Sequence, residues 1–125
     1  YIQGKPLIVT EVNLSLAPGN PEESKAFISE LTRKRQEKQP LSLPSAGSVF
    51  KRPEGYYAGR LIECAGLKGY RIGDAQVSEK HAGFIVNLGE ATAKDVITLI
   101  ETIKQKVKEV AGVELEHEIR IVGEE

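Results

Sequence analysis

Residues 92–110 carry the pattern that most limits how this chain can fold. Apolar side chains recur there at intervals of three and four, which places them on one face of a helix. Thr92 followed by Asp95 is typical of a helix N-terminus, and Gly112 suits the end. The sequence therefore predicts a helix of about five turns with one face in the core. Its apolar stripe consists of Val96, Leu99, Ile100, Ile103, Val107 and Val110.

Three other stretches have the composition and spacing of β-strands. Residues 7–16 begin as a short apolar run and then alternate apolar and polar side chains, as in a strand with one buried face. Residues 84–88 are mostly apolar and lie between two glycines, and residues 116–122 close the chain with a further alternation. Residues 75–77 could form only a short strand, and the glycine-punctuated residues 67–74 are expected to be irregular.

Two further helices are predicted before the long one. Asn20 as N-cap and Pro21 at the first helical position begin a helix over residues 21–36, and residues 56–65 have helical spacing over a shorter stretch. Strands and helices do not alternate in regular βαβ units along the chain. We therefore expect a single α+β domain over residues 1–125, with a mainly antiparallel sheet, two longer helices and one short helix.

Composition limits the class of partner. The 125 residues are 40% hydrophobic and 28% charged, and the net charge is −1, which gives no reason to expect nucleic acid or an anionic membrane as partner. Neither a transmembrane helix nor a signal peptide is visible, so a cytoplasmic protein is the default expectation. The single cysteine, Cys64, lies in an apolar stretch and is expected to be a buried, inert thiol in a reducing compartment.

Residues 44–53 form the most unusual segment, because small residues, one hydroxyl, one aromatic ring and two cations lie between two prolines. Each proline fixes its own φ and keeps the preceding residue out of the helical region, which predicts a rigid loop. Gly47 allows a sharp turn there and so exposes the hydroxyl of Ser48. The alternative is an ordinary Gly/Ser turn ahead of a strand.

Several standard catalytic devices are absent from the sequence. No strand leads into a glycine-rich phosphate loop, His81 and His117 are too isolated to indicate a zinc site, and no metal is expected. Gly47-Ser48 lacks the second glycine of a nucleophile elbow, although a Ser–His–carboxylate hydrolase stays a formal alternative. Chemistry can then reside in Ser48, Glu118 and the cations Arg35, Lys51, Arg52 and Arg120.

Each of these residues also has a purely structural interpretation. Ser48 could be a loop hydroxyl bonded to backbone, and Glu118 and Arg120 could be one solvated face of a strand. The basic run 33–35 suits the negative end of a helix dipole equally well.

Five blocks in order resemble the C-terminal, substrate-binding domain of the UDP-N-acetylenolpyruvoylglucosamine reductases, and the resemblance covers essentially the whole chain. These blocks are Pro-Ser-Ala-Gly-Ser-Val-Phe-Lys-Arg-Pro (44–53), Ala-Gly-Arg-Leu-Ile-Glu (58–63), Ala-Gly-Leu-Lys-Gly (65–69), Val-Ser-Glu-Lys-His-Ala-Gly-Phe-Ile-Val-Asn (77–87) and Gly-Val-Glu-Leu-Glu-His-Glu-Ile-Arg-Ile-Val-Gly (112–123).

The resemblance implies an oxidoreductase of peptidoglycan precursor synthesis, and so a role in cell wall biogenesis, cell shape and cell division. In that family FAD and NADPH supply the hydride that reduces a UDP-sugar enolpyruvate to UDP-N-acetylmuramate. The family's N-terminal FAD-binding domain, which binds most of the cofactor, is absent from this chain and is expected as its partner. The fragment alone is therefore expected to be inactive.

The resemblance also implies roles for individual residues. Ser48 matches the serine that donates a proton to C2 of the substrate, and Glu118 matches the glutamate that helps to stabilise the enolic intermediate. Arg35 and Gln39 match positions near the flavin and the substrate carboxylate. Arg120 is expected to bind substrate and, with Arg35, to approach the cofactor.

Two positions depart from the family pattern or remain open. Many members have Lys-Asn-Pro where this chain has Lys51-Arg52-Pro53, so Arg52 is expected to reach a diphosphate or carboxylate in place of the asparagine, with Lys51 beside it. No insertion carries the extra substrate-binding tyrosine of some members. His81 either orients the site or is a plain buried histidine, and the second interpretation is slightly favoured.

A function from another class stays open: a stand-alone interaction module that keeps the fold without catalysis. A flavin-binding region encoded upstream would favour the reductase, whereas a start codon directly before Tyr1 would favour the module.

Overall fold

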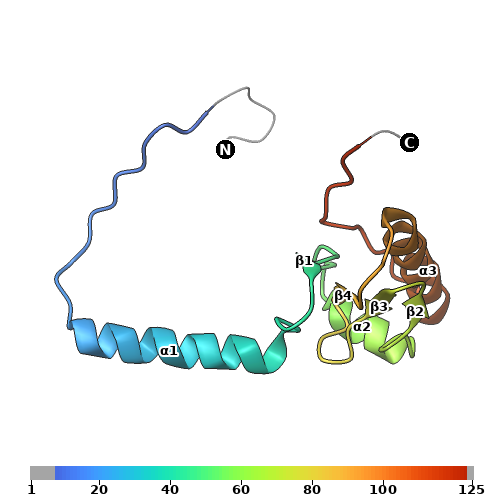
Figure 1. The fold of residues 1–125 in the computed structure, drawn as a ribbon, viewed down its shortest axis with the longest axis horizontal. Coiled ribbons are helices and arrows are strands. Elements are labelled where there is room, and N and C mark those ends of the chain that lie inside the picture. The colour runs from blue at the N-terminus through green and yellow to red at the C-terminus, as the bar shows by residue number, and fades with distance from the viewer. Residues whose placement is uncertain (1–7, 124–125) are drawn as a thin grey trace.

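The chain forms one antiparallel sheet that shares a hydrophobic core with two helices, while a third helix extends away from this core (Figure 1). This computed structural model describes residues 8–123. The expected α+β architecture with two longer helices and one short helix is confirmed. In chain order the elements are α1 (Pro21–Lys38), β1 (Ser45–Ser48), α2 (Ala58–Cys64), β2 (Arg71–Ile72), β3 (Ala75–Val77), β4 (Phe84–Asn87) and α3 (Ala93–Ala111).

The sheet has the order β1-β4-β3-β2, and every neighbouring pair is antiparallel. The predicted rigid loop at 44–53 is in part a strand, because β1 pairs with β4. This pairing is irregular: Ser45 lies opposite Val86 and Ser48 opposite Phe84, so three steps along β1 match two along β4. Gly47, with φ of 87°, occupies this β-bulge, where a left-handed backbone favours glycine.

Helix α3 buries one face in the core, as its apolar stripe predicts. Leu99, Ile100, Ile103 and Val107 are all buried against the sheet and α2. Thr92 and Asp95 form a reciprocal capping box at its start, and Gly112 ends it in the left-handed conformation. The predicted burial of Val110, at the C-terminal end of this stripe, is wrong, since its side chain is exposed.

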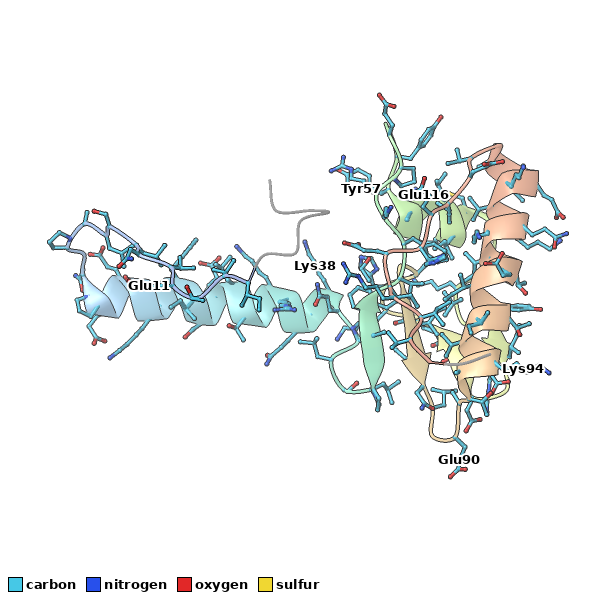
Figure 2. The ribbon with its side chains drawn as sticks, turned by 90° about the horizontal axis from the view of Figure 1, so that it is seen from above. Glu11, Lys38, Tyr57, Glu90, Lys94 and Glu116 are labelled. Carbon is cyan, nitrogen blue, oxygen red and sulfur yellow. The ribbon has the colours of Figure 1, made fainter. Side chains whose placement is uncertain are left out.

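Helix α1 begins at Pro21 behind the predicted cap, because the Asn20 side chain accepts a hydrogen bond from the Glu22 N–H. None of its residues is buried, and its apolar residues Phe27, Ile28 and Leu31 are all exposed. Figures 1 and 2 show the helix stretching away from the sheet, with residues 8–20 turning back from its far end over its length. The predicted strand over 7–16 is wrong for residues 8–16, which have no strand partner, and residue 7 lies outside the described residues.

Three smaller predictions also need correction. The closing strand at 116–122 is reduced to one bridge, in which His117 pairs with Phe50. The stretch 67–74 is not wholly irregular, because it contains β2. Cys64 is exposed at the end of α2, so it is not the buried thiol that its apolar neighbours predict.

No helix within residues 8–123 combines the length and the apolarity that a membrane crossing requires.

Candidate functional site

Ser48 and Glu118 lie at the same place in the fold although 70 positions separate them. The backbone of residues 116–118 runs antiparallel to that of residues 49–51, with the Glu118 N–H donating to the Val49 carbonyl at 2.7 Å and the Lys51 N–H donating to Glu116 at 2.9 Å. Between these bonds lies the Phe50–His117 bridge. Ser48 and Glu118 thereby line one small cavity of about 320 Å³, with Ala46 and Ile119.

The Ser48 hydroxyl is available to a ligand. It ends β1, its side chain is exposed, and its Oγ lies 3.5 Å from the Phe50 carbonyl, at the outer limit of a hydrogen bond. The interpretation of Ser48 as a loop hydroxyl satisfied by backbone therefore receives little support. Glu118 is also exposed, so both side chains meet solvent on the same open side.

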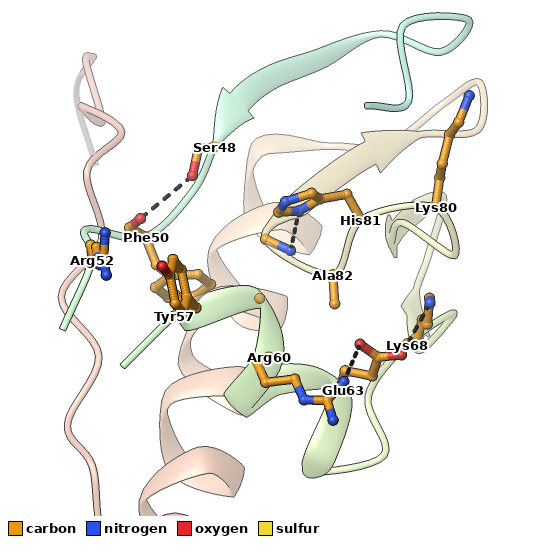
Figure 3. Close-up of a pocket in the computed structure, with 13 residues that line it drawn as sticks. Ser48, Phe50, Arg52, Tyr57, Arg60, Glu63, Lys68, Lys80, His81 and Ala82 are labelled. Atoms are coloured by element: carbon orange, nitrogen blue, oxygen red, sulfur yellow. Dashed lines mark hydrogen bonds and ion pairs between the residues drawn. The ribbon is translucent and has the colours of Figure 1, made fainter. Parts of the chain in front are cut away.

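Ser48 also lines a second cavity of about 320 Å³ (Figure 3). Its wall contains four cations and a single carboxylate, which gives it an excess of positive charge. Such a concavity attracts anionic ligands. The lining residues are Ser48, Phe50, Arg52, Tyr57, Ala58, Gly59, Arg60, Glu63, Lys68, Lys80, His81, Ala82 and Gly83.

Two of these cations are partly neutralised by the carboxylate of the same wall. Lys68 lies 3.3 Å from Glu63, and Arg60 lies 4.0 Å from the same side chain. Lys80 instead donates to the Gln36 carbonyl at 2.6 Å, which connects the loop after β3 to the end of α1. These contacts leave Lys80 without a carboxylate partner among the described residues.

Arg52 and Lys51 point to different neighbours. The Arg52 guanidinium lies 4.1 Å from the centre of the Tyr57 ring, a cation–π contact at the edge of the second cavity. Lys51 pairs with Glu116 at 2.8 Å. Its hydrogen bond and charge interaction with Glu116, aided by Glu118, raise the pKa of Lys51, and the same contact lowers the pKa of Glu116. Lys51 thus connects the chain after β1 to the segment that carries Glu118.

The remaining predicted residues are not brought into these cavities. Arg35 and Gln39 contact each other at the end of α1, where the Arg35 Nε–H donates to the Gln39 side chain at 2.9 Å. The Gln39 N–H also donates to the Arg35 carbonyl, so Gln39 caps the helix. Arg120 is exposed two residues beyond Glu118 and lines neither cavity.

His81 is the residue whose setting the sequence misjudged. It is exposed and lines the second cavity, so the interpretation as a plain buried histidine is wrong. Two glycines accompany it in space: a Cβ at Gly59 or at Gly83 would lie only 3.2 Å or 3.0 Å from the His81 ring. Both glycines stand in the sequence, but nothing local indicates that they meet the same ring. Tyr57, Arg60, Lys68 and Lys80 were likewise not identified as lining residues.

Comparisons with known proteins agree on one family. Residues 39–122 match the family described as UDP-N-acetylenolpyruvoylglucosamine reductase, C-terminal domain. The reductase of that name from Caldanaerobacter subterraneus subsp. tengcongensis is 62% identical to this chain over 98% of its length. The one from Alkaliphilus oremlandii is 59% identical over 99% of this chain.

A solved structure gives the same family name. The crystal structure of the reductase from Thermus caldophilus superposes with a TM-score of 0.61 at 46% identity, covering 78% of this chain and 34% of that chain. This chain spans only 41% of the length of those two curated relatives.

Proposed function

Because this chain belongs to the C-terminal domain family of UDP-N-acetylenolpyruvoylglucosamine reductases, we propose that it is the substrate-binding part of such an enzyme. The proposed reaction is the NADPH-dependent reduction of the enolpyruvyl ether of UDP-N-acetylglucosamine to UDP-N-acetylmuramate. Its product serves peptidoglycan precursor synthesis. The relatives are more than twice as long as this chain, which leaves room for a companion domain in the full protein.

The observation that carries this proposal is the shared cavity of Ser48 and Glu118. Reduction of an enolpyruvyl ether adds hydride at C3 and a proton at C2, with negative charge building up between these two events. A site for this chemistry needs a proton source beside a group that controls the charge of the enolic intermediate. A serine and a glutamate from distant parts of the chain, facing one small cavity, have the chemical composition for both tasks.

In this mechanism Ser48 gives its hydroxyl proton to C2 after the hydride has arrived. A serine hydroxyl is a weak acid, so it donates only to a strong base such as a developing carbanion in a closed, preorganised site. Glu118 stabilises the enolic intermediate in the same cavity. The cations of the second cavity bind the anionic part of the substrate. Among them, Arg52, which lies against Tyr57, is the one predicted from the sequence.

The cofactor of the proposed reaction is FAD, which would supply the hydride when bound. The residues of this chain fit a flavin that would lie against one side of the site, because Ser48 and Glu118 are both exposed there. Arg35 and Arg120 are the cations proposed to approach it, and both are exposed. Most of the contacts to the cofactor are assigned to the part of the protein that precedes this chain.

We also propose a cytoplasmic location. The exposed single thiol of Cys64 suits a reducing compartment, where unpaired cysteines persist.

The full-length protein that contains this chain tests the proposal. We expect a flavin absorption band and NADPH oxidation that depends on the UDP-sugar enolpyruvate, with UDP-N-acetylmuramate identified by mass spectrometry. A full-length protein that binds flavin but oxidises no NADPH with this substrate would contradict the proposed function.

A further inference from the structure

The His81 ring is held in one orientation by contacts on several sides. Its Nδ1 accepts a hydrogen bond from the Gly83 N–H at 3.1 Å, and the ring forms a T-shaped pair with Phe84 at a centroid distance of 5.1 Å and an interplanar angle of 76°. The loop that carries it is fixed by the buried Ser78 hydroxyl, which accepts from the N–H groups of Lys80 and His81. The ring is therefore positioned before any ligand arrives.

The hydrogen bond from Gly83 also decides which ring nitrogen carries the proton. A backbone N–H can only donate, so Nδ1 must be the unprotonated acceptor in this arrangement. In a neutral imidazole the proton then resides on Nε2. Within residues 8–123 no hydrogen bond to Nε2 is found, and Figure 3 shows the ring reaching from its loop toward the side of the cavity that holds Ser48.

Gly59 and Gly83 leave the space that this orientation needs. A Cβ at Gly83 would lie 3.0 Å from His81 Cε1, and one at Gly59 would lie 3.2 Å from the same atom. Gly59 is the second residue of α2, where alanine would favour the helix more than glycine does. The glycine there makes physical sense because the imidazole lies against it.

We infer that His81 is a fixed neutral donor whose Nε2–H binds an oxyanion of the substrate in the cationic second cavity. The inference rests on the proposed function, which supplies two oxyanion sources, the diphosphate and the enolpyruvyl carboxylate. Arg52 and Lys80, which line the same cavity, provide the charge that attracts either group. The neutral donor orients the bound group, since the single Nε2–H of a fixed ring defines the position of the oxygen that accepts from it.

The test compares His81→Asn, His81→Ala and His81→Gln in the full-length enzyme. The Gln side chain can place an N–H near the position of Nε2, whereas Asn and Ala cannot. Titration calorimetry with UDP and with the UDP-sugar enolpyruvate gives each Kd without relying on turnover. We expect Asn and Ala to weaken binding about tenfold or more, as for a lost hydrogen bond to a charged group, and Gln to restore most of it.

The two ligands separate the two sources of the oxyanion. Weakened binding of both UDP and the full substrate assigns Nε2–H to the diphosphate, and weakened binding of the full substrate alone assigns it to the carboxylate. Unchanged Kd values for both ligands in His81→Asn would overturn the inference. Equal losses in His81→Gln and His81→Ala would also overturn it, because the donor would then not matter.

A second pair of variants tests the role of the glycine. Gly83→Ala should weaken binding in the protein with His81 and should have little further effect in the His81→Ala background, because the added methyl meets only the ring at less than 3.4 Å. An undiminished effect of Gly83→Ala without the imidazole contradicts that route. Turnover by the unmutated enzyme is scored separately, so failure of the proposed reaction is distinguishable from failure of the His81 assignment.

Discussion

The Glu118 N–H donates to the carbonyl of Val49 at 2.7 Å, which fixes Glu118 beside Ser48, the residue before Val49. The proton source and its proposed charge partner are therefore positioned by main-chain bonds and not by their own side chains. Substitution of either side chain should leave this backbone arrangement intact. Kinetic effects of such changes can then be attributed to lost chemistry.

Ser48→Ala in the full-length enzyme should slow turnover roughly a hundredfold or more while substrate affinity stays close to that of the unmutated protein. The hydroxyl is used only when a proton is placed on C2, so it contributes to general-acid catalysis and little to ground-state binding. Steady-state kinetics together with substrate titration measure both quantities. Ser45→Ala, at the other end of β1, is the matched control and should retain activity. Near-normal turnover of Ser48→Ala would remove Ser48 from the mechanism.

Glu118→Gln should reduce kcat more than it weakens substrate binding. The intermediate that Glu118 is proposed to stabilise forms only beyond the ground state, so loss of the carboxyl group raises the barrier and leaves the Michaelis complex largely unchanged. The comparison of kcat with Kd for the substrate checks this. Glu114→Gln, on the same C-terminal segment, is the control, and a change confined to affinity would show that Glu118 only binds.

Asp95→Asn should make the stability of the 125-residue chain less sensitive to acid. The Thr92 backbone N–H, and then the Thr92 side chain, lower the pKa of Asp95 in the folded protein. A lowered folded-state pKa contributes stability that is present above the unfolded value of about 3.8 and is lost as the pH falls through the folded pKa. Thermal unfolding between pH 7 and pH 2.5 measures the effect, and identical pH profiles would refute it.

The 125-residue chain alone should fold, remain colourless and catalyse no NADPH oxidation. The core of α3, α2 and the sheet is complete without other chains, but Ser48 and Glu118 face an open side. Catalysis needs exclusion of water and a fixed hydride donor, and one wall of a site supplies neither. Visible spectroscopy and an NADPH assay test this. A stoichiometric flavin band or measurable turnover from this chain would contradict the proposal that another part of the protein binds most of the cofactor.

Amides of α1 should exchange with solvent much faster than those of α3 in the isolated chain. Helix α1 has no buried residue, whereas α3 buries four, and most of the stability of a helix in a protein comes from packing of its apolar face. Hydrogen exchange with mass spectrometry compares the two helices within one sample. Equal protection of both would show that α1 is stabilised by something other than packing.

Elements defined by their own sequence could be predicted. The capping box and apolar stripe of α3, the cap of α1 and the glycine-bounded β4 depend on residues within a few positions of each other. The strand predicted over residues 7–16 failed for a physical reason, since alternation shows that a strand could form but not whether a partner strand is present. The same reason reduces residues 116–122 to one bridge.

In the candidate site, too, what could not be predicted is what depends on contacts between distant parts of the chain. Residue types left Ser48 and Glu118 among the candidates, and the family resemblance implied their roles. Their meeting could not be predicted from local sequence, because it depends on long-range pairing between residues 49–51 and 116–118. His81 was misjudged because its setting depends on the folded chain, where the ring lies against two glycines, at positions 59 and 83. Periodicity along the sequence contains no information about such convergence.

The bulge in β1 makes the site depend on chain length as well as on chemistry. Side chains of a strand alternate between its two faces, and the extra residue around Gly47 shifts that alternation by one step before Ser48 is reached. Removal of one residue between Ser45 and Ser48 would either close the bulge, with the left-handed backbone at Gly47 that precedes the hydroxyl, or move Ser48 out of its place opposite Phe84, although the serine itself would remain. Homologues that share every functional residue but differ by one position in this strand should therefore not be assumed to share the reaction.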